Sequence, residues 1–342
     1  MLKDMSMKNK SREMQTYILS QVEKHPGDIA TLICKRFSVT RMTAIRQLTK
    51  LIDQQKIMKS GKTSDSRYFL AESKNKLVDL KIEKTLDEFT VFQKYCGAEL
   101  KTLPENQYQI AEYCCTELIN NAKDHSQGTR LHLETRWENK GIAIQVRDNG
   151  VGIFKKLKTE LQLANLEESL LMLTKGKVTT DSNNHTGEGI FFSSRAADRF
   201  TIEANKIKYT KDNIENDWFY EKTDLKSGTK ITLFIGNKCA RILKDIFQEY
   251  TNPSDYHFDK TEILVELSRF GDERYISRSQ AKRILIGLEK FRRVVLDFRG
   301  IETVGQGFVD EVFRVFQNKN PAIEISYRHA NDNVTFMIER GL

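Results

Sequence analysis

Two polar side chains four residues apart are the first candidates for chemistry. Glu117 and Asn121 lie in the segment CTELINNAKDHS, and their spacing brings them onto one face of a helix. A carboxylate in such a place can accept a proton from an attacking hydroxyl, and an amide oxygen is a hard ligand suited to Mg²⁺. A Glu and an Asn at this spacing are usually a solvated pair, so the pair alone is weak evidence of a site.

Three glycine-containing segments follow the pair along the chain. Asp148-Asn149-Gly150-Val151-Gly152 comes directly after a predicted strand, Thr186-Gly187-Glu188-Gly189 precedes a predicted helix, and Gly228-Thr229 opens a further strand. Glycines at a helix start leave backbone N–H groups available to phosphates. Neither Gly-x-Gly continues to the third glycine of a dinucleotide fingerprint, and Gly61-Lys62-Thr63 lacks the first glycine of a P-loop. Each segment alone therefore reads as a turn or a loop.

Together and in this order, the four segments resemble the motifs of the GHKL ATPase family, over about residues 105–235. That family includes gyrase, heat-shock chaperones, mismatch-repair ATPases, sensor histidine kinases and anti-sigma kinases. Glu117 to Asn121 matches its N-box, Asp148-x-Gly150-x-Gly152 its adenine-binding box, and Gly187-x-Gly189 its phosphate-binding box. The resemblance implies an α/β sandwich of the Bergerat type that binds ATP and Mg²⁺.

The resemblance also implies a role for each matched residue. Asn121 would bind Mg²⁺, and Glu117 would be the catalytic base. The other matched residues would bind the nucleotide: Asp148 and Thr229 at the adenine, Gly150 and Gly152 near base and sugar, and Thr186, Gly187 and Gly189 at the phosphates. Segment 154–185 would be a lid over ATP, with Lys175 or Lys177 as phosphate contacts.

The surrounding sequence predicts elements that would position these residues. A helix over 106–125 would carry the N-box, and strands over 130–137 and 141–147 would lead to Asp148. Later strands are expected at 201–204, 218–220 and 229–235. We expect an ATP-binding domain over 105–243, preceded by a helical linker over 77–104.

The first 76 residues differ from the rest in charge. They hold 16 Lys and Arg against 7 Asp and Glu, so they account for the whole formal net charge of +8. Apolar spacing predicts helices over 11–25, 28–37 and 41–55, followed by two short strands at 56–60 and 67–70. Three helices and a hairpin in this order are typical of a winged helix-turn-helix, and the positive charge favours DNA over a protein partner.

The third of these helices would be the one that reads DNA. Ile45, Leu48 and Ile52 are expected to face inward. The residues expected to contact DNA are Arg41, Thr43, Arg46, Gln47 and Lys50 on the helix, and Lys62 and Arg67 on the wing.

The C-terminal segment RRVVLDFRGIETVGQGFVDEVFRVF resembles a STAS-like domain of the anti-sigma-antagonist type, over about residues 258–342 of a domain expected from 244 to 342. Asp297 fits the end of a strand. Gly305-Gln306-Gly307 lies where those antagonists carry Asp-Ser, so the phospho-acceptor serine is missing. This departure favours a docking or dimerisation module over a phospho-switch, and it leaves a protein partner or a homodimer as the expectation.

Histidines and cysteines suggest no further chemistry. None of the six histidines is followed by the Glu of a sensor-kinase acceptor hairpin, which disfavours an autophosphorylating kinase. The five cysteines form no Cys-x-x-Cys pair, so neither a zinc site nor a disulfide framework is expected. With no long apolar run and no signal peptide, the expected location is the cytoplasm.

The fold class expected is therefore α/β multidomain: a winged helix-turn-helix, a GHKL α/β sandwich and a small STAS-like α/β domain. The leading hypothesis is an ATP-responsive DNA-binding regulator of transcription that binds ATP and Mg²⁺. One alternative is a serine/threonine kinase of the anti-sigma type that acts on a separate protein. Another is the ATPase module of a DNA-transaction or defence system.

Overall fold

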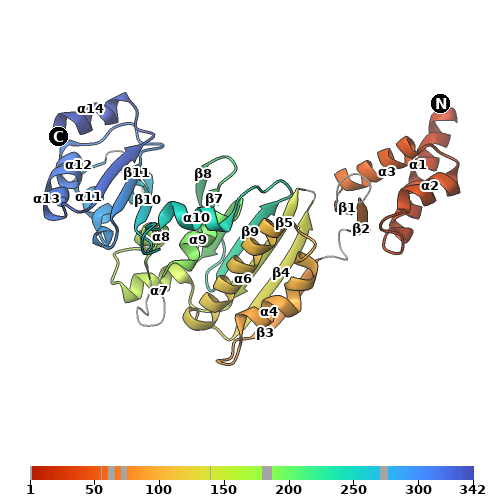
Figure 1. Cartoon of the computed structure of the whole chain (residues 1–342), viewed down its shortest axis with the longest axis horizontal. Helices are drawn as coiled ribbons and strands as arrows, with labels where there is room; N and C mark the ends of the chain where they lie inside the picture. The colour runs from red at the N-terminus through yellow and green to blue at the C-terminus, as the bar shows by residue number, and fades with distance from the viewer. Residues whose placement is uncertain are drawn as a thin grey trace. The chain divides into compact units, whose positions relative to one another are not determined.

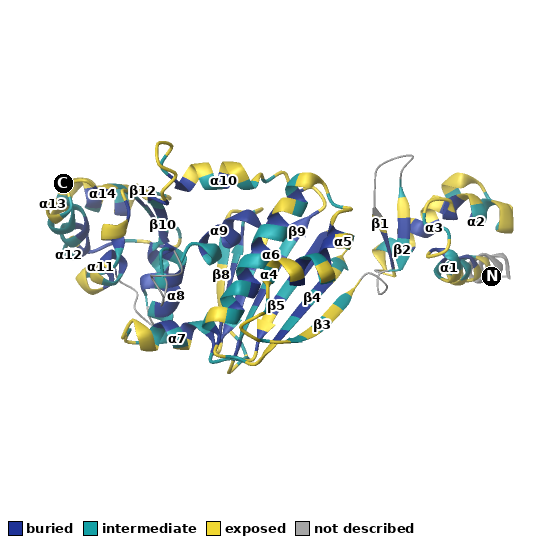
Figure 2. Cartoon of the chain, turned by 60° about the horizontal axis from the view of Figure 1, so that its bottom comes forward, coloured by how far each residue is buried: buried dark blue, intermediate teal, exposed yellow. Residues whose placement is uncertain are grey.

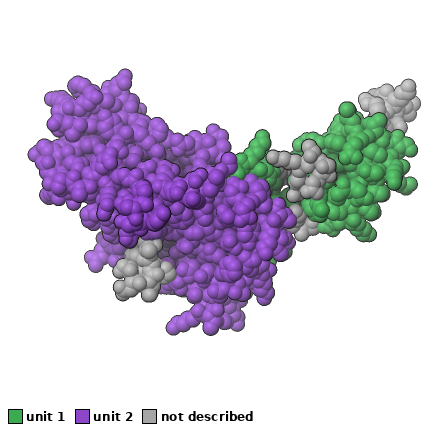
Figure 3. All heavy atoms as spheres, viewed as in Figure 1, with its two compact units in different colours: residues 1–79, 132–145, 233–239 green, residues 80–131, 146–232, 240–342 purple. Residues whose placement is uncertain are grey.

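The computed structural model describes residues 2–54, 56–60, 66–70, 75–138, 140–178, 187–269 and 276–342. The fold is mixed α/β with several sheets, as the sequence predicts (Figure 1). The chain divides into two compact units, one of residues 1–79, 132–145 and 233–239, the other of residues 80–131, 146–232 and 240–342 (Figure 3). None of the described helices is long and apolar enough to cross a membrane.

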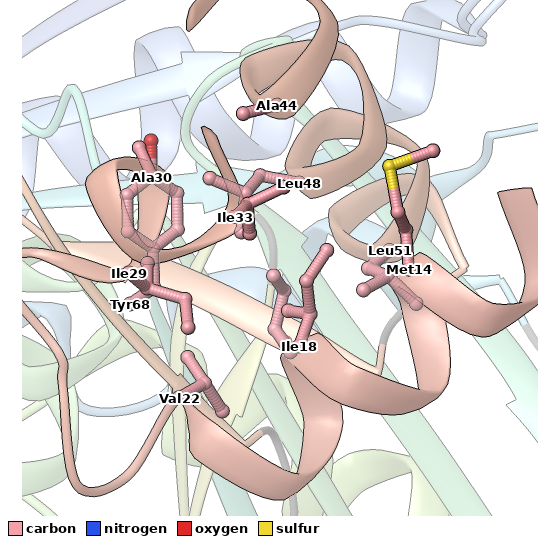
Figure 4. Packing of buried hydrophobic residues seen from close by; sticks show 11 residues of the cluster. Met14, Ile18, Val22, Ile29, Ala30, Ile33, Ala44, Leu48, Leu51 and Tyr68 are labelled. Atoms are coloured by element: carbon pink, nitrogen blue, oxygen red, sulfur yellow. The ribbon is translucent and has the colours of Figure 1, made fainter. Parts of the chain in front are cut away.

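The N-terminal residues of the first unit form a small helical core. Its elements are α1 (Leu2–Gln21), α2 (Ile29–Phe37), α3 (Arg41–Asp53), β1 (Ile57–Ser60) and β2 (Arg67–Leu70). The two strands pair antiparallel. Ile18, Ile33, Leu48 and other apolar side chains of all three helices are buried against one another (Figure 4). The predicted three helices and hairpin are confirmed as elements.

A seven-stranded sheet has the order β3-β4-β5-β9-β6-β7-β8. Its strands are β3 (Lys76–Lys81), β4 (Arg130–Glu138), β5 (Gly141–Asp148), β6 (Arg199–Ala204), β7 (Ile207–Asp212), β8 (Asp217–Lys222) and β9 (Thr229–Gly236). Burial alternates along β4 and β6, the signature of a sheet with one face on a core (Figure 2). The predicted strands are confirmed.

The predicted helical linker over 77–104 is wrong at its start, because residues 76–81 form the edge strand β3. Exposure alternates residue by residue along this strand. The apolar residues Leu77, Val78 and Leu80 do not alternate in the sequence, so their spacing fits a helix as well as a strand. Helical structure begins only at α4 (Glu88–Phe92) and continues through a π-helical turn, η2 (Gln93–Gly97), to α5 (Ala98–Leu100).

The longest helix of the second unit is α6 (Glu105–His125), and it packs on α9 (Gly189–Ala196). Between them in sequence lie α7 (Ile153–Glu160) and α8 (Leu166–Lys175). Phe191 and Phe192 of α9 stack with Phe258 and with Phe247 and Tyr250 of α10 (Leu243–Tyr250). This aromatic cluster fixes α9, so its N-terminus has a defined position.

The C-terminal part of the second unit contains a three-stranded parallel sheet in the order β10-β11-β12. Its strands are β10 (Lys260–Leu264), β11 (Arg293–Asp297) and β12 (Glu324–Arg328). The helices are α11 (Arg278–Leu285), α12 (Gln306–Val309), α13 (Gln317–Lys319) and α14 (Asp332–Gly341), with 3-10 turns η3 (Val265–Ser268) and η4 (Leu288–Lys290) and a π-helical turn η5 (Asp310–Phe316). The three strands end at one common edge because they are parallel.

Candidate functional site

One cavity of about 120 Å³ brings together most of the residues that the sequence singles out. Those that line it are Glu117, Asn121, Asp148, Gly152, Gly187, Gly189 and Thr229. They come from α6, the end of β5, the start of α9 and the start of β9, elements separated by up to 112 positions in sequence. Segments that look like ordinary turns when taken singly thus converge on one concave site.

Asp148 is the buried polar anchor of this cavity. Its side chain is 5% exposed. The carboxylate accepts hydrogen bonds from the backbone N–H of Gly150, at 2.8 Å, and from the backbone and hydroxyl of Thr229. Burial raises the pKa of Asp148, and these hydrogen bonds offset part of that rise. The result is a fixed acceptor at the wall of the cavity.

Thr229 connects the segment after Asp148 to the sheet. Its hydroxyl oxygen accepts a hydrogen bond from the backbone N–H of Ile153 at 3.0 Å, at the start of α7. Asn205 holds the same segment from the other side, because its amide donates to Val151 O and accepts from Lys155 N. The backbone between Asp148 and α7 is therefore held in place without any ligand.

Glu117 and Asn121 are half-buried on α6, one turn apart, and both face the cavity. The Glu117 carboxylate lies against Gly189, where a Cβ atom would collide with it. The first N–H groups of a helix have no partner within that helix, so the start of α9 offers donors at this point. A carboxylate, an amide and a helix N-terminus are thus adjacent.

Close packing explains why positions 150 and 187 are occupied by glycine. A Cβ on Gly150 would collide with the carbonyl oxygen of Ser126, and Gly150 itself does not line the cavity. Gly187 has φ +72°, and a Cβ there would lie 2.6 Å from the backbone of Val178. At these positions two backbone segments of the site approach too closely for a Cβ atom. Glycine is therefore required here whether or not a ligand binds.

Two lysines of the predicted lid lie elsewhere. Lys177 does not line the cavity, and its Nζ donates to the carbonyl oxygen of Lys290 at 2.8 Å. Lys175 is 1% exposed, and its Nζ donates to the carbonyl oxygens of Arg283 and Ile286 at 3.0 and 2.9 Å, at the end of α11. A phosphate contact for either lysine stays a prediction, and it would require these bonds to break. Thr186 lies outside the described residues.

Lys175 makes one of several contacts between α8 and the elements β10 and α11. Its carbonyl oxygen accepts a hydrogen bond from the hydroxyl of Thr261 at 2.6 Å. Glu168, at the other end of α8, lies 3.8 Å from the guanidinium of Arg283. The helix α8, which lies within the predicted lid, is therefore held at both ends by residues of β10 and α11.

Sequence reasoning missed two charged residues of the cavity, Lys156 and Glu188. Lys156 is largely buried, and its Nζ donates to the carbonyl oxygen of His125 at 2.9 Å. Burial raises the pKa of the Glu188 carboxyl, and nearby Lys177 partly counteracts the rise. Lys156 stands four residues after Gly152 on the following helix, a spacing that could have indicated it. In the described parts of the chain, no three His, Cys, Asp or Glu side chains form a metal-binding group.

Two residues of the predicted DNA-reading helix, Gln47 and Ile45, differ from expectation in their exposure. Gln47 is buried, with 3% of its surface exposed, and its side-chain oxygen accepts hydrogen bonds from Ser11 and Gln15 of α1. Ile45, expected to face inward, is 42% exposed. The predicted exposure of Gln47 is wrong because α1 supplies polar partners on this face.

The other residues predicted to contact DNA are mostly exposed. Arg41, Arg46, Lys50 and Arg67 are exposed and Thr43 is half-buried, whereas Lys62 lies outside the described residues. Thr40 caps α3, accepting from the backbone N–H of Thr43. The exposed face of α3 therefore carries three cationic side chains.

Comparison with known proteins identifies one part of the chain. Residues 280–335 match the model of a STAS-like domain of unknown function (DUF4325). This match confirms the predicted STAS-like domain at the C-terminal end. The matched residues contain most of α11, all of β11 and β12, and the helices between these strands. No curated protein matches the chain.

Proposed function

We propose that the protein is an ATP-responsive DNA-binding regulator, with a GHKL-type nucleotide site and a winged helix-turn-helix. The cavity that gathers Glu117, Asn121, Asp148 and Thr229 carries the nucleotide part of the proposal. Four motifs that are each weak in sequence come together in it, in the order and on the elements that the family resemblance implies.

The residues present fit an adenine nucleotide. A volume of about 120 Å³ is close to the roughly 150 Å³ of an apolar cavity that takes up benzene, so it suits a flat ring. Asp148 is a fixed acceptor for an exocyclic amino group, with Thr229 beside it. The N-terminus of α9 suits phosphates, and Asn121 would share Mg²⁺ with their oxygens.

The chain's own groups define what the site does with a bound nucleotide. Bound Mg²⁺ would neutralise the negative charge of the phosphates, which the carboxylates of Glu117 and Glu188 would otherwise repel. Glu117, adjacent to Gly189, is placed to accept the proton of an attacking hydroxyl. The attachment of α8 to β10 and α11 links the lid region to the STAS-like domain, a route by which nucleotide binding would change the domain arrangement.

Calorimetry with Mg²⁺-ATP tests the nucleotide site. We expect Asn121→Ala to abolish binding, and Glu117→Ala to keep binding while stopping turnover. Gln109→Ala, at an exposed position of the same helix, is the matched control. Normal Mg²⁺-ATP binding by Asn121→Ala would show that the site is assigned wrongly.

DNA binding is tested separately, by fluorescence anisotropy over a salt series. The regulator proposal expects binding that weakens steeply with salt and changes when ATP is added. Absence of DNA binding at low salt would refute it. Transfer of phosphate from ATP to a separate protein would instead support the serine/threonine kinase.

A further inference from the structure

The outer face of α3 carries apolar side chains that the N-terminal core does not use. Met42 is 81% exposed and Ile45 is 42% exposed. The opposite side of the same helix supplies the core, where Ala44, Leu48 and Leu51 are fully buried (Figure 4). Two large apolar side chains therefore face outward on a helix that already packs through its other side.

These side chains belong to a stripe along the helix. Met42, Ile45 and Thr49 are spaced three and four residues apart, which places them on one side of a helix with about 3.6 residues per turn. Thr49 is exposed like the other two. All three side chains carry methyl groups, so the stripe presents methyl groups to whatever the helix contacts.

Cationic side chains border the methyl stripe. Arg41 and Lys50 are both exposed and nine residues apart, about two and a half turns, so they lie on opposite sides of the stripe. Arg46 is exposed too, directly after Ile45. The charge and the apolar surface together fit a partner with negative charge along both sides of an apolar strip.

Duplex DNA presents this combination in its major groove. The groove has phosphates along both sides, admits an α-helix, and carries on its floor one apolar group, the C5-methyl group of thymine. The helix α3 follows α2 after the three residues 38–40, with Ser38 at φ +52°. A turn of this length joins the two helices of helix-turn-helix motifs, whose second helix meets base edges with its N-terminal residues. Met42 and Ile45 lie in the first two turns of α3.

Gln47 of the same helix does not supply the hydrogen bonds by which a side-chain amide reads adenine. Its side chain is 3% exposed and accepts hydrogen bonds from Ser11 and Gln15 of α1. An amide that reads adenine must instead face the groove. The thymine methyl group is therefore the feature of an A·T pair that the methyl stripe of α3 can recognise.

We propose that Met42 and Ile45 contact the C5-methyl groups of thymine, so that α3 selects duplex DNA with A·T pairs in the groove that it enters. Arg41 and Lys50 contact the phosphates on the two sides of that groove. The inference rests on the DNA-binding part of the proposed function and adds the bases that are recognised. One thymine methyl group packed against an apolar side chain corresponds to a change of about fourfold in affinity.

Replacing thymine by uracil tests the contact, because uracil lacks only the C5-methyl group. Two duplexes of one mixed A·T sequence, one with thymine and one with uracil, are titrated with the full chain at low salt, and binding is measured by fluorescence anisotropy. We expect the thymine duplex to bind at least about fourfold more tightly. The double variant Met42→Ala, Ile45→Ala should bind both duplexes equally. Its slope of log binding constant against log salt concentration should stay at the wild-type value, because neither residue is charged.

Leu77→Ala is the matched control, because Leu77 is 70% exposed and lies on β3, outside α3. This variant should keep the wild-type preference for thymine. Equal affinity of the wild type for both duplexes would overturn the methyl contact, keep DNA binding, and favour a protein partner for the stripe. An undiminished preference in the double variant would also overturn the proposal. Absence of binding to either duplex at low salt would refute DNA binding, and the methyl contact with it.

Discussion

Replacing Lys175 by methionine should change how stability depends on pH. Methionine keeps an unbranched stem of similar length but cannot donate to the carbonyl oxygens of Arg283 and Ile286. Lys175 is 1% exposed, and burial lowers its pKa from 10.5 to about 7. The nearby carboxylates of Glu289 and Glu168 counteract only part of this shift.

The sign follows from the protons bound in each state. The unfolded chain keeps the ordinary pKa of 10.5, so between about pH 7 and 10.5 it binds more protons than the folded chain. The contribution of Lys175 to the free energy of unfolding therefore rises with pH between about pH 7 and 10.5. Below about pH 7 this contribution does not change with pH. From about pH 6 to pH 9 the two pKa values predict that the free energy of unfolding of the wild type rises by about 2.7 kcal/mol. Lys175→Met should lack this rise.

Urea denaturation at several pH values measures the difference. Of the two tryptophans, Trp218 lies in the unit that contains Lys175, so a Trp137→Phe background isolates the signal of that unit. Lys282→Met, at an exposed position of α11, is the control and should run parallel to the wild type. If the profiles of wild type and Lys175→Met are also parallel, Lys175 does not titrate and the reasoning fails.

Three further predictions, two of them with a comparison variant, test other parts of the structure. Ile18→Ala removes a fully buried side chain of the N-terminal core and should cost about 2–5 kcal/mol in urea denaturation, and a loss below 1 kcal/mol would contradict that packing. In anisotropy titrations Arg46→Ala should weaken DNA binding and lower by about one the slope of log binding constant against log salt concentration. Gln47→Ala should lower stability and leave that slope unchanged. Gly187→Ala should weaken nucleotide binding and destabilise its unit by about 1–3 kcal/mol, because Gly187 has a left-handed backbone conformation. Gly27→Ala should have neither effect, because a Cβ there meets nothing within 4 Å.

Local features of the candidate site were predictable from sequence. Glu117 and Asn121 share a helix face through a fixed four-residue spacing, and Asp148 ends a strand whose apolar residues alternate. Such patterns depend on neighbours within one element, so they need no knowledge of the fold. The STAS-like domain was recognisable for the same reason, because its strand, loop and helix are contiguous in sequence.

Features that depend on distant partners were not predictable. Gln47 is buried because Ser11 and Gln15 of another helix satisfy its amide, and Lys177 is drawn to the carbonyl of Lys290. Asp297 likewise meets Arg328 and His329, which lie 31 and 32 positions later in the chain. In each case a polar group found its partner through tertiary packing, which residue type and spacing do not encode.

The close approach of Gly187 to Val178 joins two parts of the site that are nine positions apart in the chain. The backbone of Val178 lies where a Cβ of Gly187 would be. Val178 follows α8, and Gly187 precedes Gly189, which lies against the Glu117 carboxylate. A displacement of the end of α8 would therefore be passed through one backbone contact to the residues that face the cavity.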